Sequence, residues 1–444
     1  MSRWKRLATL GGLTGRVTTS YLGAAVREAV QDYTPFGSGA VGDDAKKVAK
    51  DRLHLENAKE IADTLSRMKG AAMKLGQQLA VAASSLDLPE EVAGTLAKLH
   101  KDAEPVPFAT IREDVERSLG MSLAEAYDEF DEVPLGTASL GQAHLARVGG
   151  AEVVVKILHR GVDLAVDTDL LALKAVLLGS RALRRDRAEV EAAFDEIRKH
   201  LKEELDYLQE AVNLQQFGEA FAGDDRVRIP RLHHALCTER VLTMDRIPGQ
   251  HVEAFVASST EEARQTAGKT LADLYYTQLF RLRMLHADPH PGNYLFDADG
   301  RVGMVDFGCV KRFDPWWMAT YARAALASLA RDRETILECC LDLGAWNGTD
   351  AGDGDLLFDF VDGMSKGFRA GEVALGAEHE QLMEEMRPVL QRFVRRPTVH
   401  IPKDVLFAHR SLAGLYTIQR RLGTRTDFGA VLKHHAAYAV AAAG

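Results

Sequence analysis

The stretch Leu285–Gly308, LHADPHPGNYLFDADGRVGMVDFG, sets three polar residues among apolar neighbours. Asp288 precedes Asn293 by five positions, and Asp306 lies inside the tetrapeptide V-D-F-G. Carboxylate and amide oxygens are ligands that Mg²⁺ prefers, and a positioned carboxylate accepts a proton from an attacking hydroxyl. The stretch therefore predicts a magnesium–phosphate site, in which Asn293 and Asp306 hold the metal ion and Asp288 is the catalytic base.

Two histidines, His286 and His290, lie beside Asp288 and offer a different interpretation. Imidazole is a common ligand of zinc and copper, so this pair is an alternative metal site. No third soft ligand lies close to them in the sequence, however. We expect the two histidines and the neighbouring prolines to shape the loop.

A lysine, Lys156, lies in the middle of the apolar run VVVKIL at 153–158, which follows a predicted hairpin turn at Gly149 and Gly150. A buried charge in a strand is costly unless it meets a partner. One interpretation is a phosphate-binding lysine. The alternative is an edge strand from which the ammonium group reaches solvent.

The segment 195–217, DEIRKHLKEELDYLQEAVNLQQF, is predicted to be one helix. Its apolar residues Ile197, Leu201, Leu208 and Val212 follow the helical period. Asp206, Glu210 and Asn213 fall at i, i+4 and i+7 and would share one face. We expect Glu210 to be the carboxylate that orients Lys156, although such charge runs are more often solvated faces.

The segment PLGTASLGQAHLA at 134–146 precedes the lysine strand and is rich in small residues. Small side chains let backbone N–H groups approach a phosphate closely, and a plain turn is an equally open interpretation. The candidate phosphate-binding residues are Gly136, Thr137, Ala138 and Ser139, followed by Gly141.

These parts occur in the order found in a protein kinase: strand lysine, helix glutamate, a strand ending near Met244, D-x-x-x-x-N and D-F-G. The order predicts an α+β, bilobal protein-kinase-like fold with a small lobe built on an antiparallel sheet and a large, mostly helical lobe. We divide the chain into an extension or linker (1–50), a helical extension (51–130), the small lobe (131–250) and the large lobe (251–444).

Four motifs resemble the UbiB family of atypical kinase-like proteins, also called AarF-domain or ubiquinone-biosynthesis kinases, over roughly residues 51–350. They are KLGQ at Lys74–Gln77, ELDYLQEAVN from Glu204, HADPHPGN from His286, and VDFG. The resemblance implies that the K-x-G-Q helix covers the nucleotide site, that Lys74 reaches the carboxylate of Glu204, and that Gln77 lies nearby. It also implies a catalytic role for the E-x-D stretch that ends at Asp206.

The same resemblance makes LTMDRI a kinase-like hinge, whose backbone at Met244, Asp245 and Ile247 would contact adenine. The G-T-A-S loop departs from the family's alanine-rich loop, so the preference between ATP and ADP stays open. The expected cofactors are ATP or ADP and Mg²⁺.

The chain after Gly308 contains no A-P-E motif and no long polar segment of the kind that docks peptides. We therefore expect an ATPase or phosphotransferase that acts on, or is regulated by, isoprenoid or quinone-related lipids. One alternative is a scaffold or chaperone that binds nucleotide without turnover. An ordinary peptide kinase is a third, less favoured interpretation.

Composition limits the partners and the setting. The net charge of −9 over 444 residues argues against nucleic acid as the main partner, and four cysteines are too few for a disulfide framework. We expect a cytoplasmic protein, peripheral at the inner face of the membrane, where its basic N-terminal stretch would lie on anionic lipid. The alternative for this stretch is an ordinary surface helix or a disordered arm. Helical residues 350–444 offer no evident chemistry, and we expect His409 and Arg410 at the core edge or on the surface.

Overall fold

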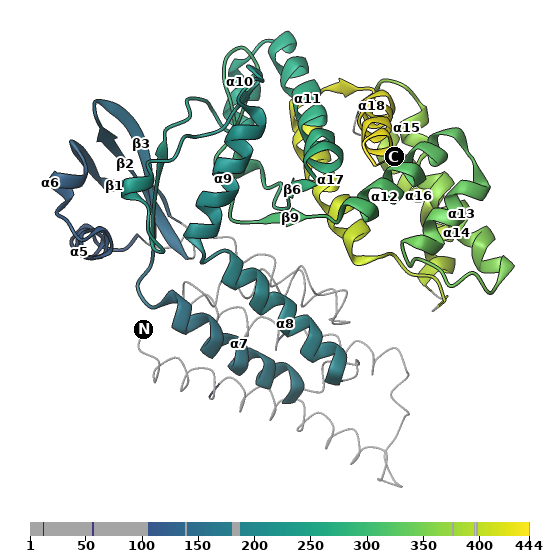
Figure 1. Cartoon of the computed structure of the whole chain (residues 1–444), viewed down its shortest axis with the longest axis horizontal. Coiled ribbons are helices and arrows are strands. Elements are labelled where there is room, and N and C mark those ends of the chain that lie inside the picture. The colour runs from purple at the N-terminus through teal and green to yellow at the C-terminus, as the bar shows by residue number, and fades with distance from the viewer. Residues whose placement is uncertain are drawn as a thin grey trace, which may run out of the picture. The chain divides into compact units, whose positions relative to one another are not determined.

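A computed structural model describes residues 105–137, 140–179, 187–374, 377–394, 396 and 398–443, together with Gly12 and Glu56. The described chain divides into two compact units (Figure 1). The first takes the described residues up to Gln209 and the segment Leu232–Asp245, and the second takes Glu210–Arg231 and everything from Arg246 onward. The four segments expected from the sequence stay predictions.

The first unit is built on a four-stranded antiparallel sheet of β1 (Glu129–Thr137), β2 (Gly141–Val148), β3 (Ala151–Leu158) and β5 (Val241–Asp245), in the order β1-β2-β3-β5. Strands β2 and β3 form the hairpin predicted around Gly149 and Gly150. Both glycines have positive φ, 58° and 78°, a conformation that residues with a Cβ rarely adopt.

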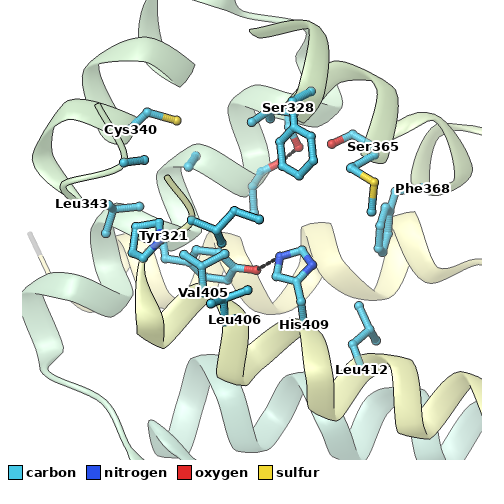
Figure 2. Close-up of a pocket in the computed structure, with 18 of the residues that line it drawn as sticks. Tyr321, Ser328, Cys340, Leu343, Ser365, Phe368, Val405, Leu406, His409 and Leu412 are labelled. Carbon is cyan, nitrogen blue, oxygen red and sulfur yellow. Dashed lines mark hydrogen bonds between the residues drawn. The ribbon is translucent and has the colours of Figure 1, made fainter. Parts of the chain in front are cut away.

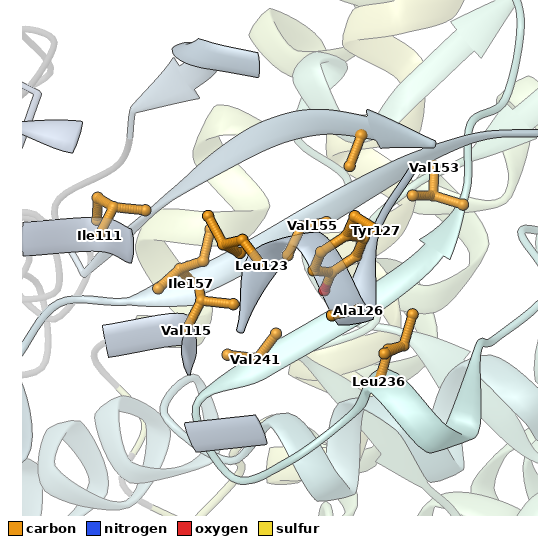
Figure 3. Close-up of a cluster of buried hydrophobic side chains, with 11 residues drawn as sticks. Ile111, Val115, Leu123, Ala126, Tyr127, Val153, Val155, Ile157, Leu236 and Val241 are labelled. Carbon is orange, nitrogen blue, oxygen red and sulfur yellow. The ribbon is translucent and has the colours of Figure 1, made fainter. Parts of the chain in front are cut away.

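One face of this sheet carries the core of the first unit (Figure 3). In β3 the residues alternate, and Val153, Val155 and Ile157 are fully buried. They pack with α5 (Phe108–Leu119) and α6 (Leu123–Ala126) in one hydrophobic cluster. The apolar run at 153–158 therefore predicted this strand correctly, and the alternation appears in its burial, because one of the two faces is the buried one.

Helices α7 (Val162–Gly179) and α8 (Arg187–Glu203) lie side by side, and α9 (Tyr207–Phe221) follows them (Figure 1). The prediction of one helix over 195–217 is wrong. The chain leaves the helix at Glu204, and the Oδ1 atom of Asp206 accepts a hydrogen bond of 2.9 Å from the N–H of Gln209. An Asp in this position caps the start of a new helix, which is why the periodic pattern is interrupted there.

The interruption also changes which residues of α9 are buried. Ile197 and Leu201 are buried as predicted, whereas Leu208 and Val212 are each 47% exposed. Asp206 precedes α9, so it does not share a helical face with Glu210 and Asn213. Helix α9 buries Glu210 and Asn213, two polar residues, beside its apolar side chains.

The second unit is mainly helical (Figure 1). Its longer helices are α10 (Val252–Ser258), α11 (Glu261–Tyr276), α12 (Pro315–Ala330), α13 (Arg333–Asp342), α14 (Ala351–Met364), α16 (Ala377–Val394), α17 (Lys403–Leu422) and α18 (Phe428–Ala441). A π-helical turn, η2 (Thr277–Leu282), follows α11, and α15 (Lys366–Arg369) is one short turn.

Short strands in this unit carry the polar motifs. Strand β6 (Met284–His286) pairs with β9 (Val310–Arg312), and β8 (Val302–Met304) lies between β4 (Val227–Arg228) and β7 (Tyr294–Phe296). An antiparallel sheet in one unit and a helical second unit confirm the predicted α+β class. In the described parts of the chain, none of the helices combines the length and apolar character that crossing a bilayer requires.

Candidate active site

The loop between β6 and β7 brings Asp288 and Asn293 together. Asn293 ends a short 3₁₀ turn (η3, Pro291–Asn293), where its N–H donates to the carbonyl of His290 over 2.9 Å. Its side-chain Nδ2 donates to the main-chain oxygen of Asp288 over 2.9 Å and to the carboxylate Oδ2 over 3.2 Å. The amide therefore fixes the orientation of the Asp288 carboxylate.

Both histidines of this stretch make hydrogen bonds that hold the loop. The Nδ1 atom of His290 accepts from the N–H of Gly292 over 3.0 Å. His286 is buried, its Nε2 donates to the carbonyl of Asp306 over 2.7 Å, and its N–H donates to the side chain of Gln278. These contacts confirm that the two histidines shape the loop.

The V-D-F-G segment lies between β8 and β9, beside the Asp288 loop. The carbonyl of Asn293 accepts from the N–H of Val305 over 3.1 Å, which places Asp306 one residue away from that contact. Asp306 Oδ1 accepts from the N–H of Gly308 over 3.1 Å. The structure thus brings all three residues of the opening motif together in the second unit.

The donor set fits a magnesium ion. Because the Nδ2 atom of Asn293 is used for Asp288, the amide oxygen is the atom left for a ligand. Asp306 adds carboxylate oxygens from the neighbouring segment. Carboxylate and carbonyl oxygens are the ligands that Mg²⁺ takes in phosphoryl-transfer sites.

Tyr294, which follows Asn293, lies beside the same carboxylate. Burial raises the pKa of its phenol, and the negative charge of Asp288 raises that pKa further. Its ring packs against His286, with centroids 6.0 Å apart. Tyr294 is therefore a neutral, buried support of the loop.

Helix α9 holds the D-F-G segment through its main chain. Glu210 is 3% exposed, and its Oε1 atom accepts from the N–H of Phe307 over 3.2 Å. Asn213, one turn further, donates its Nδ2 to the carbonyl of Phe307 over 2.9 Å and accepts from Arg312. The sequence prediction did not assign this role to Asn213, although its spacing from Glu210 is the signal that would find it.

Lys156 lies in an interior strand. In the antiparallel register it is the partner of Ala143 in β2 and of Leu242 in β5, so the edge-strand alternative is wrong. Its half-buried side chain lies on the face opposite to Val155 and Ile157, because neighbouring residues of a strand alternate. Lys156 belongs to the first unit and Glu210 to the second, and their pairing stays a prediction.

The described residues of the small-residue segment belong mainly to the end of β1 and to β2. Gly136 and Thr137 end β1, where they pair with Ala143 and Gln142, whereas Ala138 and Ser139 lie outside the described residues. A Cβ at Gly141 would lie 2.5 Å from the carbonyl oxygen of Ile157. Only glycine fits there, so β2 and β3 approach closely at the end of the sheet that carries this turn.

The predicted hinge lies where the first unit passes into the second. Met244 is buried in β5, and Asp245 Oδ1 lies 2.8 Å from Nε2 of His233. The division between the units falls directly after Asp245, and Ile247 packs on Gly303 in the second unit. Contact of this backbone with adenine stays a prediction.

Comparison with known proteins identifies the family. The ABC1 atypical kinase-like domain matches residues 98–340, more than half of the chain. The chain belongs to the ABC1 atypical kinase-like family. This confirms the resemblance to UbiB proteins that the sequence motifs indicated.

Individual relatives of this ABC1 chain are also named atypical kinases. The mitochondrial atypical kinase COQ8 of Schizosaccharomyces pombe is 26% identical, over 98% of this chain and 70% of the relative. The mitochondrial atypical kinase COQ8B of Rattus norvegicus is 29% identical, over 95% of this chain and 78% of the relative. The ABC1 chain is therefore an atypical kinase-like enzyme.

A solved structure supports the fold. The Rv3197–erythromycin complex from Mycobacterium tuberculosis matches with a TM-score of 0.60 and 24% identity, covering 87% of this chain and 97% of the other. The likeness confirms the kinase-like fold expected for an ABC1 protein.

The remaining predicted residues of the ABC1 chain belong to the E-x-D and K-x-G-Q stretches. Glu204 lies in the turn between α8 and α9, and Asp206 caps α9, so neither is part of the helix that carries Glu210. Lys74 and Gln77 lie outside the described residues. The contact between Lys74 and Glu204 stays a prediction.

Proposed function

We propose that this chain is a Mg²⁺-dependent ATPase or phosphotransferase that acts on, or is regulated by, small isoprenoid or quinone-related lipids rather than proteins. The observation that carries the proposal is the hydrogen bonding of Asn293, which joins the Asp288 carboxylate to the segment bearing Asp306. A base, an amide ligand and a carboxylate ligand held in one place are the parts that phosphoryl transfer requires.

In this mechanism Asp288 orients the attacking hydroxyl or water and accepts its proton, while Asn293 keeps the carboxylate in position. Asn293 and Asp306 hold Mg²⁺, which when bound supplies positive charge to the phosphate oxygens. Lys156 neutralises the α- and β-phosphates, and Glu210 orients the lysine. Catalysis then depends on positioning and on electrostatic stabilisation of the transferred group.

The nucleotide contacts come from backbone groups. The N–H groups of Gly136, Thr137, Ala138 and Ser139 approach the phosphates of ATP or ADP, and the backbone at Met244, Asp245 and Ile247 contacts the adenine. The close approach of β2 to β3 at Gly141, next to this turn, supports the placement. Comparing ATP and ADP affinities would settle the preference that the G-T-A-S loop leaves open.

The K-x-G-Q segment is proposed as a lid over the nucleotide. Lys74 reaches Glu204, Gln77 lies nearby, and Asp206 belongs to the same polar group. This arrangement would limit what reaches the γ-phosphate. Glu204 lies in the turn between α8 and α9.

A small-molecule acceptor follows from the segment after D-F-G. Only the three residues of β9 form regular structure between Gly308 and α12, which begins at Pro315. Protein kinases place an activation segment between D-F-G and A-P-E. So short a connection supports a small or lipid acceptor, or water, rather than a docked peptide.

We also propose a cytoplasmic protein at the inner face of a membrane, with nucleotide and lipid as partners and no nucleic acid. The supporting features are the net charge of −9 and the basic stretch MSRWKR at the N-terminus.

The test is ATP hydrolysis by the wild-type chain, with and without Mg²⁺, anionic liposomes and a phenolic quinone-precursor analogue. Asp306→Asn is expected to lower the rate by about 10²–10³-fold. Asp299→Asn is the matched control, because Asp299 is an exposed aspartate in the preceding turn, and it should leave the rate unchanged.

Three outcomes would contradict the proposal. If the wild-type chain binds nucleotide but hydrolyses none under every condition, it is a nucleotide-binding scaffold. If Asp306→Asn is as active as wild type, the assigned metal ligand is wrong. Efficient phosphorylation of a generic protein would favour an ordinary peptide kinase.

A further inference from the structure

A cavity of about 350 Å³ lies among the helices of the second unit (Figure 2). Its walls come from α11 and η2 and from the helices α12 to α18. Aromatic and aliphatic side chains dominate the lining, for example Phe280, Phe360, Val405 and Leu412. No Lys, Arg, Asp or Glu is among the described residues that line it.

Among the polar residues of the described lining, Tyr321 and His409 form a hydrogen-bonded pair. The hydroxyl of Tyr321 on α12 and Nε2 of His409 on α17 are 3.0 Å apart (Figure 2). His409 is an exposed residue of α17 that lines the cavity, in line with the core-edge or surface position expected from the sequence. Burial lowers the pKa of His409 and raises that of Tyr321, so both groups are neutral near pH 7.

Two polar atoms around the cavity have hydrogen-bonding capacity to spare. The buried hydroxyl of Tyr276, a lining residue that is 2% exposed, has no hydrogen-bond partner among the described residues. His409, an exposed residue of the lining, uses its Nε2 atom for Tyr321 and offers its Nδ1 atom as a second polar group. Buried polar groups are normally satisfied, so an orphan in a cavity wall indicates a missing partner.

We propose that the cavity binds a small neutral amphiphile, a hydrocarbon chain or ring with a single hydroxyl or carbonyl group that meets His409 and Tyr321. Apolar cavities of about 150 Å³ already stay dry and take up apolar molecules, and ligand pockets begin at about 300 Å³. A few polar groups in an apolar wall fix a ligand's orientation. A carboxylate or phosphate is excluded, because no cation in the described lining would compensate its burial.

The cavity walls also touch the candidate catalytic loop. Helix α17 carries His409, and five residues later Gly414, where a Cβ would lie 2.2 Å from Cγ of Pro289. Leu279 and Phe280 line the cavity from η2, which leads directly into β6 and Asp288. A ligand in the cavity is therefore expected to change the rate of ATP hydrolysis. This consequence rests on the proposed function, whereas the binding of the ligand is independent of it.

The test uses the full chain and two probes with the same hydrocarbon chain, dodecanol and dodecanoate, each below its aggregation concentration. Native mass spectrometry gives stoichiometry and titration calorimetry gives affinity at pH 7.5. We expect one dodecanol per chain, bound at least about tenfold more tightly than dodecanoate.

Filling the cavity provides the matched variants. Ala325→Leu places a larger side chain in the lining of α12, and Val361→Phe does so from α14. Each should weaken dodecanol binding by about tenfold or more. Ala330→Leu, on the exposed end of α12 and outside the lining, is the control and should bind as wild type does. Circular dichroism and the thermal midpoint show that each variant is folded.

Equal dodecanol affinity in wild type and in the folded filling variants would overturn the proposed site. Equal or tighter binding of dodecanoate would overturn the neutral ligand class. A dodecanol-dependent change in ATP hydrolysis that is present in Ala330→Leu and absent in the filling variants would support the coupling. If dodecanol binds but does not change the rate of ATP hydrolysis, the coupling between the cavity and the catalytic loop is overturned and the binding site stands. If the wild-type chain hydrolyses no ATP, the result contradicts the proposed function and leaves the binding site standing.

Discussion

Asn213 is a single buried amide that holds two parts of the candidate site. It donates to the carbonyl of Phe307 and accepts from Arg312, and the contact with Phe307 spans 94 positions of the sequence. Truncating one partner leaves the other groups buried without a hydrogen bond, which is more costly than the bond itself is stabilising. Asn213 thus acts on the D-F-G segment by positioning it.

Asn213→Ala is therefore expected to lower the free energy of unfolding by about 1–3 kcal/mol. Asp306 directly precedes Phe307 in the chain, so a displaced Phe307 also displaces Asp306. The rate of ATP hydrolysis should therefore fall as well, with nucleotide still bound. Urea denaturation and steady-state kinetics measure both effects. Gln215→Ala, an exposed residue of the same helix bonded only to Glu219 in the described chain, should change neither; equal effects would contradict this role.

Sequence reasoning found Asp288, Asn293 and Asp306 because their contacts are local and their spacing reflects one loop. It did not find Asn213 or Gln278 as supports, since nothing near an amide in the sequence shows which distant backbone group it will bond. It also put no chemistry in residues 350–444. His409 became a candidate only from the structure, in which helices α11 to α18 and the turn η2 line a cavity beside it.

The sequence predicted strand β3 correctly but missed the break between helices α8 and α9, and both outcomes have physical reasons. Strand β3 follows from the short apolar run VVVKIL after a glycine turn, which the sequence displays directly. The break between α8 and α9 does not, because KEELDYLQE consists largely of good helix formers and the capping role of Asp206 depends on where the chain turns. Two helices with different buried faces were therefore mistaken for one.

Helix α17 gives a prediction about packing. Ala is favoured over Gly in a helix interior by about 1 kcal/mol, yet Gly414→Ala would place a methyl group against Pro289. We expect this clash to cancel the gain, lowering stability by about 1–3 kcal/mol, and to lower ATP hydrolysis by about tenfold or more through displacement of the Asp288 loop. Urea midpoints and turnover rates measure the two effects.

The control for Gly414→Ala is Gly218→Ala in α9, where the nearest atom to an added Cβ is 3.9 Å away. This variant should be more stable by up to about 1 kcal/mol with unchanged hydrolysis. If both variants behave alike, the contact between α17 and Pro289 has no effect on the site.

The stability of the complete chain should depend on pH through Asp273. This carboxylate on α11 lies 2.8 Å from Nε2 of His435 on α18 and 2.6 Å from Arg226. The hydrogen bond from His435, followed by that from Arg226, lowers the pKa of Asp273 from the ordinary 3.8 to about 2. A depressed folded-state pKa stabilises the folded chain above the ordinary pKa, and this contribution is lost as pH falls through the folded-state value.

Asp273→Asn should thus lower the unfolding free energy by about 1 kcal/mol near pH 7, a value reduced for the partial exposure of the side chain. The difference from wild type should shrink as pH falls from about 4 towards 2. Urea denaturation at several pH values measures it, with Asp299→Asn as the exposed control. A difference that stays constant with pH would show that the ion pair contributes nothing.

The hold of α9 on Phe307 has a pharmacological consequence. In protein kinases the packing of the D-F-G phenylalanine separates active from inactive forms. Here Glu210 and Asn213 form hydrogen bonds with the main chain of Phe307, and its ring is fully buried. Moving Phe307 out of this position would therefore cost a free energy of about 3–5 kcal/mol. Inhibitors that require the conformation with Phe307 out of its buried position would lose about two to four orders of magnitude in affinity. Useful compounds against this chain must therefore bind the conformation in which Phe307 is buried.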